Sequence, residues 1–387
     1  MKVEDLPNET IDFKDDLLPA VRAWLSGGLS EDFQRSCVCI GCFDQFSGGL
    51  KAKLVGGLRI DVNAVLKLGG LELKAHRDFS EFINARRPNT FPMVVHLQAL
   101  PSGQVLLLME KCRGYVTLLE KVFCEPMKLI ELNRILKKVF SALGAIHSYA
   151  PTSFQARFGE LPHDLRPFGQ RLKSKIDDVI AADSELGVIM NQPGIVNGAH
   201  CAPVTEILAN INRIEKAATL RMIPCLVHGD PHLGNIMVRK NGPTGFRVRM
   251  IDPNTEIGYS HPLYDIGKLI HWAEPVGWAK IGHDMGKRLC RSHWQSSSKR
   301  GHWRLEGKAI PTSEAAEQRR RLIEKEIRKF SERYRSSYGA VFNEMVSIAI
   351  ASAHVGLAAL FKHHSMREER RFILAYTLRH LAWLPRA

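Results

Sequence analysis

The stretch from Leu226 to Trp272 reads LVHGDPHLGNIMVRKNGPTGFRVRMIDPNTEIGYSHPLYDIGKLIHW, and it decides the fold. It contains His228-Gly229-Asp230, then Asn235 on the same predicted loop, then Asp252 at the end of a predicted hairpin. These three side chains can converge on one point. Two carboxylates and an amide oxygen are hard ligands suited to Mg²⁺. Mg²⁺ held by few protein ligands, with phosphates completing its shell, indicates phosphoryl transfer.

The pattern H-G-D-x-x-x-x-N followed by I-D-P resembles the aminoglycoside phosphotransferase and kinase-like superfamily of small-molecule kinases. That resemblance implies that Asp230 accepts the proton of the substrate hydroxyl and that Asn235 and Asp252 are metal ligands. It further implies that His228 braces the catalytic loop and that the buried Asp265 orders it. The implied cofactors are ATP or GTP together with Mg²⁺. Each residue alone could be an unrelated polar loop residue, but their order and spacing favour the site.

The upstream segment is consistent with nucleotide binding. Ala64-Val65-Leu66-Lys67 resembles the strand whose lysine touches the α- and β-phosphates. Glu81, on the predicted helix that follows, is the expected ion-pair partner of this lysine, in preference to Glu72. Without such a partner, Lys67 could equally be a solvent-facing strand lysine.

Backbone groups are expected to provide further nucleotide contacts. Ser47-Gly48-Gly49 separates two predicted strands, and the N–H groups of a glycine turn can hold phosphate oxygens. The alternative is a simple tight turn. The resemblance also implies that the backbone of Glu110 and Cys112, where the lobes join, pairs with the adenine edge.

Composition and patterning describe a chain of two or three domains. It has 387 residues, of which 45% are hydrophobic and 24% charged, as in ordinary globular proteins. Residues 36–110 are predicted to form three strands, one helix and two strands, an antiparallel sheet carrying one helix. The rest is mostly helical. Helices are expected at 12–25, 73–85, 126–149, 163–184, 203–219, 262–273, 314–337, 340–362 and 367–383, with short strands at 236–239 and 246–251.

These features, with the resemblance, predict an α+β, bilobal protein-kinase-like fold with an antiparallel N-terminal lobe and a mostly helical C-terminal lobe. The expected divisions are an N-terminal helical extension (1–35), a nucleotide-binding lobe (36–111) and a helical lobe (112–387). About 78 residues separate the helix that ends near Tyr149 from His228. In the family that the chain resembles, such an insertion belongs to small-molecule kinases and is absent from protein kinases.

The cysteines and the hydropathy pattern indicate a cytoplasmic protein. Eight cysteines are too sparse for a disulfide scaffold in a chain of this length. Cys37, Cys39 and Cys42 have no fourth ligand nearby, so strand packing is favoured over a metal site. No apolar run reaches the roughly 18 residues that a membrane span needs, and the acidic, polar N-terminus is not a secretory signal.

The net charge of +14 is unevenly distributed. Residues 278–339 carry 16 Lys or Arg against 7 Asp or Glu, and the part from Trp278 to Lys308 interleaves them with tryptophans. Such a segment can be a solvated surface, a site that attracts an anionic substrate, or a nucleic-acid surface. The first interpretation is favoured most and the last least, so nucleic acid is not an expected partner.

The leading hypothesis is a phosphotransferase that moves the γ-phosphate of ATP or GTP to a hydroxyl of a small molecule, such as a sugar, a glycoside or an antibiotic-like compound. The positive charge favours a neutral or anionic acceptor, with residues 278–308 at the rim of its pocket. The alternatives are a kinase that acts on a protein and a non-catalytic kinase-fold module. The insertion before His228 argues against the first, and the complete set of Lys67, Asp230, Asn235 and Asp252 against the second.

Overall fold

The computed structural model of the protein describes residues 38–42, 48–51, 64–69, 72–99, 105–110, 112, 114–124, 126–150, 152–154, 168–219, 224–242, 245–255, 259–284, 286–297, 302–361 and 363–384. The helix expected at 12–25, the N-terminal extension (1–35) and Ser47 lie outside these residues.

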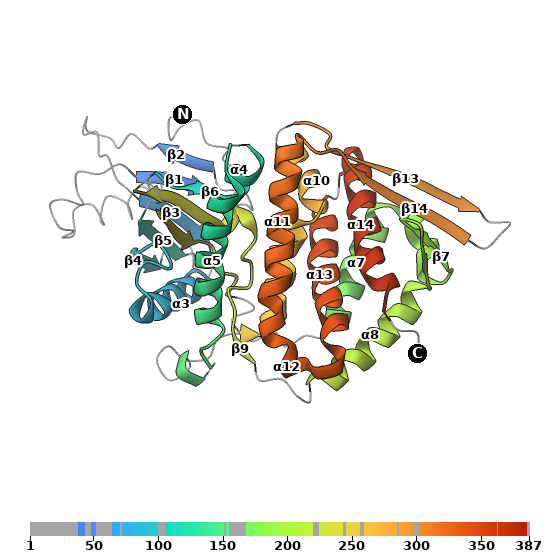
Figure 1. The fold of residues 1–387 in the computed structure, drawn as a ribbon, viewed down its shortest axis with the longest axis horizontal. Coiled ribbons are helices and arrows are strands. Elements are labelled where there is room, and N and C mark those ends of the chain that lie inside the picture. The colour runs from blue at the N-terminus through green and yellow to red at the C-terminus, as the bar shows by residue number, and fades with distance from the viewer. Residues whose placement is uncertain are drawn as a thin grey trace.

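A five-stranded sheet forms the N-terminal lobe (Figure 1). Its strands are β1 (Val38–Cys42), β2 (Gly48–Lys51), β3 (Ala64–Gly69), β4 (Val94–Ala99) and β5 (Val105–Glu110), in the order β2-β1-β3-β5-β4. All neighbouring strands are antiparallel except β1 and β3, which are parallel. The expected sheet is therefore antiparallel apart from this pair. β2 pairs with one edge of β1 in the antiparallel direction, and β3 pairs with the other edge. The strand direction therefore changes from β1 to β2 and again from β2 to β3, which makes β1 and β3 parallel.

One helix, α3 (Glu72–Arg86), packs against this sheet, close to the predicted span. Its Leu73 joins Val105, Leu107 and Met109 of β5 in a small apolar core. Helical periodicity places His76, Phe79 and Ile83 on buried faces of α3 and leaves Glu81 exposed. The phase of this helix decides which of its side chains can reach the site.

The helices of the C-terminal lobe surround α13 (Phe342–Ala358), which is apolar on nearly every side. It packs against α14 (Arg367–Ala382), α9 (Pro262–Ala273) and α7 (Phe168–Ala182). Among the described residues, the further α-helices of this lobe are α4 (Leu118–Phe123), α5 (Leu129–Ile146), α8 (Val204–Thr219), α10 (Val276–Asp284), α11 (Glu314–Ser331) and α12 (Arg335–Tyr338). The helix expected at 314–337 is thus divided between α11 and α12, with a 3-10 turn between them.

Within the described residues, the stretch Glu314–Ala358 is long and apolar enough, by composition, to cross a membrane. It includes α13, and 67% of its most apolar window is buried inside the protein. Such burial is typical of a core helix, so this stretch is weak evidence for a span.

Short strands hold the segment that carries the predicted site. The expected hairpin consists of β10 (Ile236–Asn241) and β11 (Gly245–Met250), and β6 (Val116–Thr117) adds a third strand. Just before the catalytic loop, β9 (Cys225–Leu226) pairs with β12 (Tyr259–Ser260). The two pairings fix both ends of the segment between β9 and β12.

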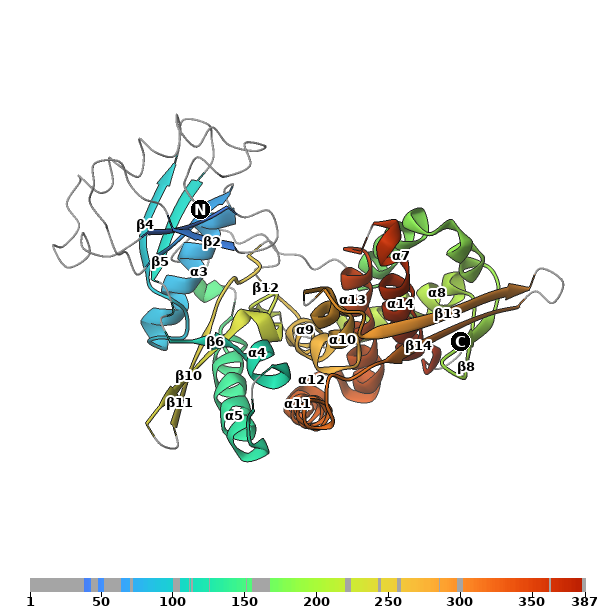
Figure 2. The same cartoon turned by 90° about the horizontal axis from the view of Figure 1, so that it is seen from above.

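A long hairpin of β13 (Cys290–Ser297) and β14 (His302–Ala309) lies at the end of the molecule opposite the five-stranded sheet (Figures 1 and 2). β14 continues into a small sheet with β7 (Gly194–Val196) and β8 (Ala199–Cys201). This hairpin occupies most of the basic segment 278–308. Two tryptophans help to hold the segment 278–308 in place, because Trp278 of α10 and Trp303 of β14 are both buried. The Trp303 indole N–H also donates to the Gln192 carbonyl at 2.8 Å.

Candidate active site

A cavity of about 980 Å³ contains most of the residues that the sequence singled out. It is lined by Lys67 of β3, by Asp230 and Asn235 of the loop after β9, and by Asp252, which follows β11. Helices α4, α7, α9, α10 and α13 complete the wall with Phe123, Arg171, Lys268, Trp272, Lys280 and Leu357, among others. The cavity therefore draws on both lobes.

Asp265 of α9 fixes the start of the catalytic loop. It is fully buried, and its two carboxylate oxygens accept hydrogen bonds from the backbone N–H groups of His228 and Gly229, each at 2.8 Å. One of these oxygens also lies 2.8 Å from Nε2 of His147, whose other ring nitrogen contacts the Tyr334 hydroxyl. Hydrogen bonds to a charged acceptor are stronger than neutral ones, so this carboxylate holds the loop firmly in place.

Gly229 is the position in this loop that requires glycine. Its φ is +80°, and a Cβ at this position would lie 2.6 Å from the carbonyl oxygen of Asn254. The Asn254 N–H in turn donates to the His228 carbonyl at 2.8 Å. The close approach of these two chain segments brings the loop of Asp230 alongside the segment after Asp252.

The Asp230 carboxylate lies between the ammonium of Lys268 and the imidazole of His232. Its Oδ1 is 3.0 Å from Lys268 Nζ, and its Oδ2 is 3.6 Å from His232 Nε2. Burial alone would raise the pKa of Asp230, but the charge of Lys268 and its hydrogen bond to the carboxylate hold it below its usual value. Asp230 is thus a carboxylate over the whole physiological range, able to orient a hydroxyl and accept its proton.

His232 is held by its own local contacts. Its Nδ1 accepts the Gly234 N–H at 3.0 Å, so Nε2 carries the proton and faces Asp230. The ring stacks on Trp272, with 4.3 Å between centroids and 6° between planes. These contacts fix the orientation in which the ring meets the carboxylate.

Asn235 and Asp252 present oxygens to the same cavity. The Asn235 Nδ2 donates to the Asp230 carbonyl at 3.0 Å, so Oδ1 is the atom that this amide can offer to a cation. Asp252 has a φ of +54°, an uncommon conformation for a residue other than glycine. Burial opposes its ionisation, but the charge of Lys67 holds the pKa of Asp252 below its usual value. An ionised carboxylate and an amide oxygen fit Mg²⁺.

Lys67 forms an ion pair with Asp252 and not with the expected Glu81. The reason is the phase of α3, which leaves Glu81 exposed and directs His76 toward the site. Burial and the nearby Lys67 lower the pKa of His76 to about 3, so this ring is neutral. Lys67 itself is 7% exposed and points into the cavity.

His228 is completely buried beneath the loop. Its Nδ1 accepts the N–H of Asp230 at 3.3 Å, and its ring stacks on Phe91 with 5.6 Å between centroids. Burial lowers the pKa of His228, so the ring is neutral. Its contacts with Asp230 and Phe91 connect the catalytic loop to the segment that follows α3.

One of the backbone groups expected to bind adenine, the N–H of Glu110, already has a hydrogen-bond partner. The Glu110 N–H donates to the Met93 carbonyl at 2.8 Å, so adenine recognition by Glu110 must use its carbonyl. Its side chain pairs with Arg249 of β11 at 2.7 Å. The Cys112 carbonyl accepts the Tyr115 N–H at 3.2 Å, which leaves its N–H as the group suited to adenine.

The structure places Gly48 and Gly49 differently from the expected turn. They are the first residues of β2 and pair with Cys42 and Gly41 of β1. They are not among the described residues that line the cavity. The strand therefore begins within the predicted glycine turn, because antiparallel pairing with β1 uses these two residues.

Sequence reasoning missed two residues that line the cavity, His232 and Lys268, and the buried His76 of α3, whose pKa is influenced by Lys67 and Asp252. His232 lies two positions after Asp230 on the same loop, and Lys268 lies one helical turn after Asp265, so each is close in sequence to a predicted site residue. That spacing could have indicated them. His76 could have been chosen over Glu81 only with the phase of α3 known.

The basic segment 278–308 does not form the expected rim. Of its described residues, only Lys280 and Ile281 line the cavity. Arg288 instead pairs with Glu368 at 3.3 Å, and Arg291 lies on the distant β13. The positive charge at the cavity comes from Lys67, Arg171, Lys175, Lys268 and Lys280.

Comparisons with known proteins agree with this geometry. The model of the phosphotransferase enzyme family matches residues 71–296, which is more than half of the chain. The chain therefore belongs to the phosphotransferase enzyme family. A search of the curated proteins found no match.

The solved structures that the chain is similar to include a putative aminoglycoside phosphotransferase from Ralstonia eutropha, with 13% identity, a TM-score of 0.45, and coverage of 82% of this chain and 85% of that one. A thermostable mutant of a second aminoglycoside phosphotransferase has 11% identity, a TM-score of 0.43, and coverage of 82% and 86%. A ternary complex of a mutant of that enzyme with ADP and hygromycin B has 11% identity, a TM-score of 0.39, and coverage of 79% and 83%.

Proposed function

We propose that the protein transfers the γ-phosphate of ATP or GTP to a hydroxyl group of a small molecule. The observation that carries this proposal is the meeting of Lys67, Asp230, Asn235 and Asp252 in one cavity between the lobes. Phosphoryl transfer depends on positioning and on electrostatic stabilisation more than on covalent chemistry. This set of residues supplies a cation, a carboxylate near the acceptor, and oxygen ligands for a metal.

Asp230 is the proposed base. Its carboxylate would orient the acceptor hydroxyl and take its proton as the bond to phosphorus forms. Lys268 keeps this carboxylate ionised, and the Asn235 side chain holds the Asp230 backbone. Lys67 would offset negative charge on the phosphates, as an ammonium group does in nucleotide sites.

Asn235 and Asp252 are the proposed ligands of Mg²⁺. Both offer oxygen atoms at the cavity, and the Asp252 side chain is 31% exposed. A bound Mg²⁺ would supply positive charge that offsets the negative charge developing on the phosphates during transfer. Lys67 forms an ion pair with Asp252 in this structure. With nucleotide and Mg²⁺ bound, the Asp252 carboxylate would interact with both the Lys67 ammonium and the metal.

The acceptor is proposed to be neutral or anionic. The wall beyond Asp230 carries Arg171, Lys175 and Lys280, with Glu120 as an opposing charge. Phe123 and Trp272 add apolar faces suited to the ring of a sugar or a glycoside. Excess positive charge in a cavity with low-dielectric walls attracts anions and disfavours polycations.

The proposal also divides the chain at the segment around Glu110–Cys112, into a nucleotide-binding lobe (36–111) and a helical lobe (112–387), with residues 1–35 as an extension. Use of a nucleoside triphosphate is consistent with the cytoplasmic location expected from the sparse cysteines.

Two measurements test this function. Thermal unfolding with and without MgATP or MgGTP should show a higher midpoint with nucleotide, because a ligand that binds only the folded state stabilises it. Transfer of labelled γ-phosphate should then be screened over acceptor pairs that differ only in charge, such as a neutral sugar, its uronic acid and its amino sugar. We expect product with the neutral or acidic members. Labelling of added proteins alone would contradict the small-molecule acceptor, and the absence of any nucleotide effect would contradict the function.

A further inference from the structure

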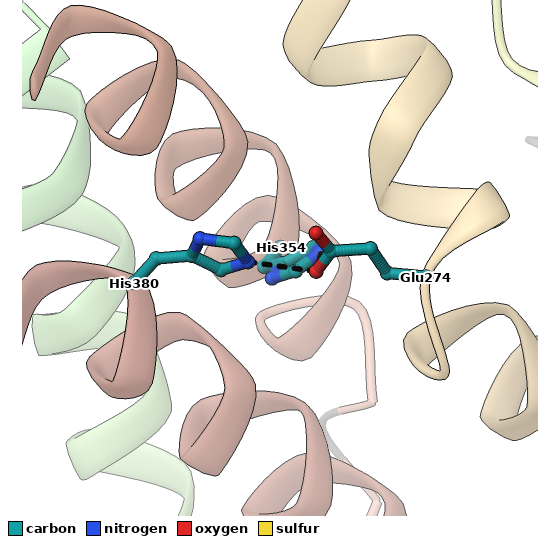
Figure 3. Close-up of side chains that lie close together, drawn as sticks. All are labelled: Glu274, His354 and His380. Carbon is teal, nitrogen blue, oxygen red and sulfur yellow. Dashed lines mark hydrogen bonds and ion pairs between the residues drawn. The ribbon is translucent and has the colours of Figure 1, made fainter. Parts of the chain in front are cut away.

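A second cluster of polar side chains lies inside the C-terminal lobe, away from the proposed active site. Glu274 follows α9, His354 belongs to α13, and His380 belongs to α14. Figure 3 shows their carboxylate and imidazole groups pointing toward one another. One ligand atom from each lies within 4.8 Å of those of the other two. None of the three is among the residues that line the proposed active-site cavity.

His354 is the unusual member of this cluster. It is completely buried, and neither ring nitrogen has a hydrogen-bond partner within the described chain. A neutral imidazole carries a lone pair on one ring nitrogen, and in His354 no donor among the described residues uses it. A buried polar group with no partner is costly and rare in folded proteins, and it calls for a ligand that would satisfy it.

Glu274 is a buried carboxylate with two differently occupied oxygens. Its Oε1 accepts a hydrogen bond from Arg328 of α11 at 2.7 Å. Its Oε2 lies 2.7 Å from His380 Nε2 and 3.5 Å from His354 Nε2. The two oxygens of this buried carboxylate therefore meet the Arg328 guanidinium on one side and the two imidazole rings on the other.

The distances in this cluster are close to those of a metal site. In tetrahedral sites with metal–ligand bonds of about 2.0–2.1 Å, neighbouring ligand atoms lie about 3.3 Å apart. The two distances from Glu274 Oε2, at 2.7 and 3.5 Å, fall on either side of that value. Small rotations of the His380 ring and the carboxylate would therefore make room for an ion.

We propose that Glu274, His354 and His380 bind a divalent transition-metal ion with the ligand preference of zinc. Two imidazole nitrogens and one carboxylate oxygen form a recognised zinc ligand set, with the fourth position left to water. Each Nε2 would present its lone pair to the ion. The proton on His380 Nε2 that now faces Oε2 would move to Nδ1 or be released, since metal binding displaces protons from its ligands.

The surrounding charges are compatible with this role. Arg328 holds Oε1, as the outer partners of metal-binding carboxylates commonly do, and leaves Oε2 for the ion. Among the described residues, His271 and Tyr376 also sense the cluster, and both are uncharged at neutral pH. Arg328 supplies the guanidinium that meets this carboxylate, and a divalent ion would give His354 the partner that it lacks within the described chain.

The proposed ion would stabilise the fold and take no part in phosphate transfer. It would connect the end of α9 to α13 and α14. Since α9 also carries Asp265 and Lys268, the ion would hold the helix that positions Asp230 and the catalytic loop.

Zinc binding to the full-length protein tests this proposal. Metal-free protein would be titrated with Zn²⁺, and both the bound zinc per chain and the thermal unfolding midpoint would be measured. His354→Gln and His380→Gln remove one ligand each, while His302→Gln removes an exposed histidine from β14 as a matched control. Substitution with Co²⁺ gives a visible spectrum that distinguishes four-coordinate nitrogen and oxygen ligands from cysteine thiolates.

We expect the wild type and His302→Gln to bind one zinc and to unfold at a higher temperature with it. His354→Gln and His380→Gln should weaken zinc affinity by at least the ~10–100-fold that outer-shell partners alone contribute to metal sites. Absence of stoichiometric zinc in the wild type, equal affinity in all four proteins, or a thiolate band in the cobalt spectrum would overturn the proposal. If His354→Gln fails to fold, His380→Gln and the wild-type cobalt spectrum still decide it.

Discussion

Replacing Lys268 with methionine tests how the proposed active site keeps Asp230 ionised. Lys268 Nζ lies 3.0 Å from Asp230 Oδ1, and its side chain is only 16% exposed. Burial acts to raise the pKa of Asp230, and the charge of Lys268 is the largest influence that lowers it. Methionine keeps the length of the side chain and removes the charge, so the effect of burial would no longer be opposed by this cation.

The expected size of the change comes from this distance. An opposite charge within about 4–6 Å lowers a carboxyl pKa by about 1–3 units, so its removal should raise the pKa of Asp230 by a similar amount. At about 1.4 kcal/mol per unit, the carboxylate loses about 1.4–4 kcal/mol of stabilisation. A depressed pKa keeps the carboxylate ionised until the pH falls through that pKa. When the pKa rises, the acidic limb of kcat must move to higher pH.

The assay is the pH dependence of kcat for phosphate transfer at saturating nucleotide and acceptor. Lys280→Met is the matched control, because it removes the same charge from the same cavity at a residue whose ammonium lies over the Trp272 ring, 5.9 Å from its centroid. We expect the acidic limb to move in Lys268→Met alone. Superimposable acidic limbs in the wild type and Lys268→Met, or equal movement in Lys280→Met, would refute this account of Asp230.

The remaining predictions concern the catalytic loop and α3. Asp265→Asn should remove at least one charge-assisted hydrogen bond to the N–H of His228 or Gly229. The free energy of unfolding in urea should then fall by about 1.5–3 kcal/mol, and an unchanged value would contradict this role. Gly229→Ala should lower kcat and cost about 1–3 kcal/mol, because φ is +80° and the new Cβ meets the Asn254 carbonyl; wild-type kcat and stability would show that the loop adapts. Glu81→Ala should stay within about 0.5 kcal/mol of wild type in urea unfolding and keep wild-type kcat, because Glu81 is exposed, and a large loss of turnover would restore it as the partner of Lys67.

The sequence predicted best those features that depend on local spacing. Asp230, Asn235 and Asp252 lie in one segment, and the short hairpin between the last two brings them together whatever the rest of the chain does. Hydrophobic periodicity likewise located α5, α9, α13 and α14 to within a few residues. The bilobal α+β fold followed from these elements and from the family resemblance.

Features that depend on helix phase or on distant packing could not be predicted. Glu81 was chosen by its distance along the chain, whereas the rotation of α3 presents His76 to Lys67. β13 lacks an alternation of apolar with polar residues, whereas β14 begins with one, His302-Trp303-Arg304-Leu305, that could have indicated a strand. The cluster of Glu274, His354 and His380 brings together residues far apart in sequence, and only the packing of three helices defines it.

The central claim is that the cavity around Asp230 is a phosphotransferase site. Its most direct test is transfer of labelled γ-phosphate by the wild type and by Asp230→Asn, with nucleotide binding measured on the same samples. The asparagine keeps the size of the side chain and removes the base, so nucleotide affinity should persist while turnover falls by about 10²–10⁴-fold. Near-wild-type turnover in Asp230→Asn would contradict the claim.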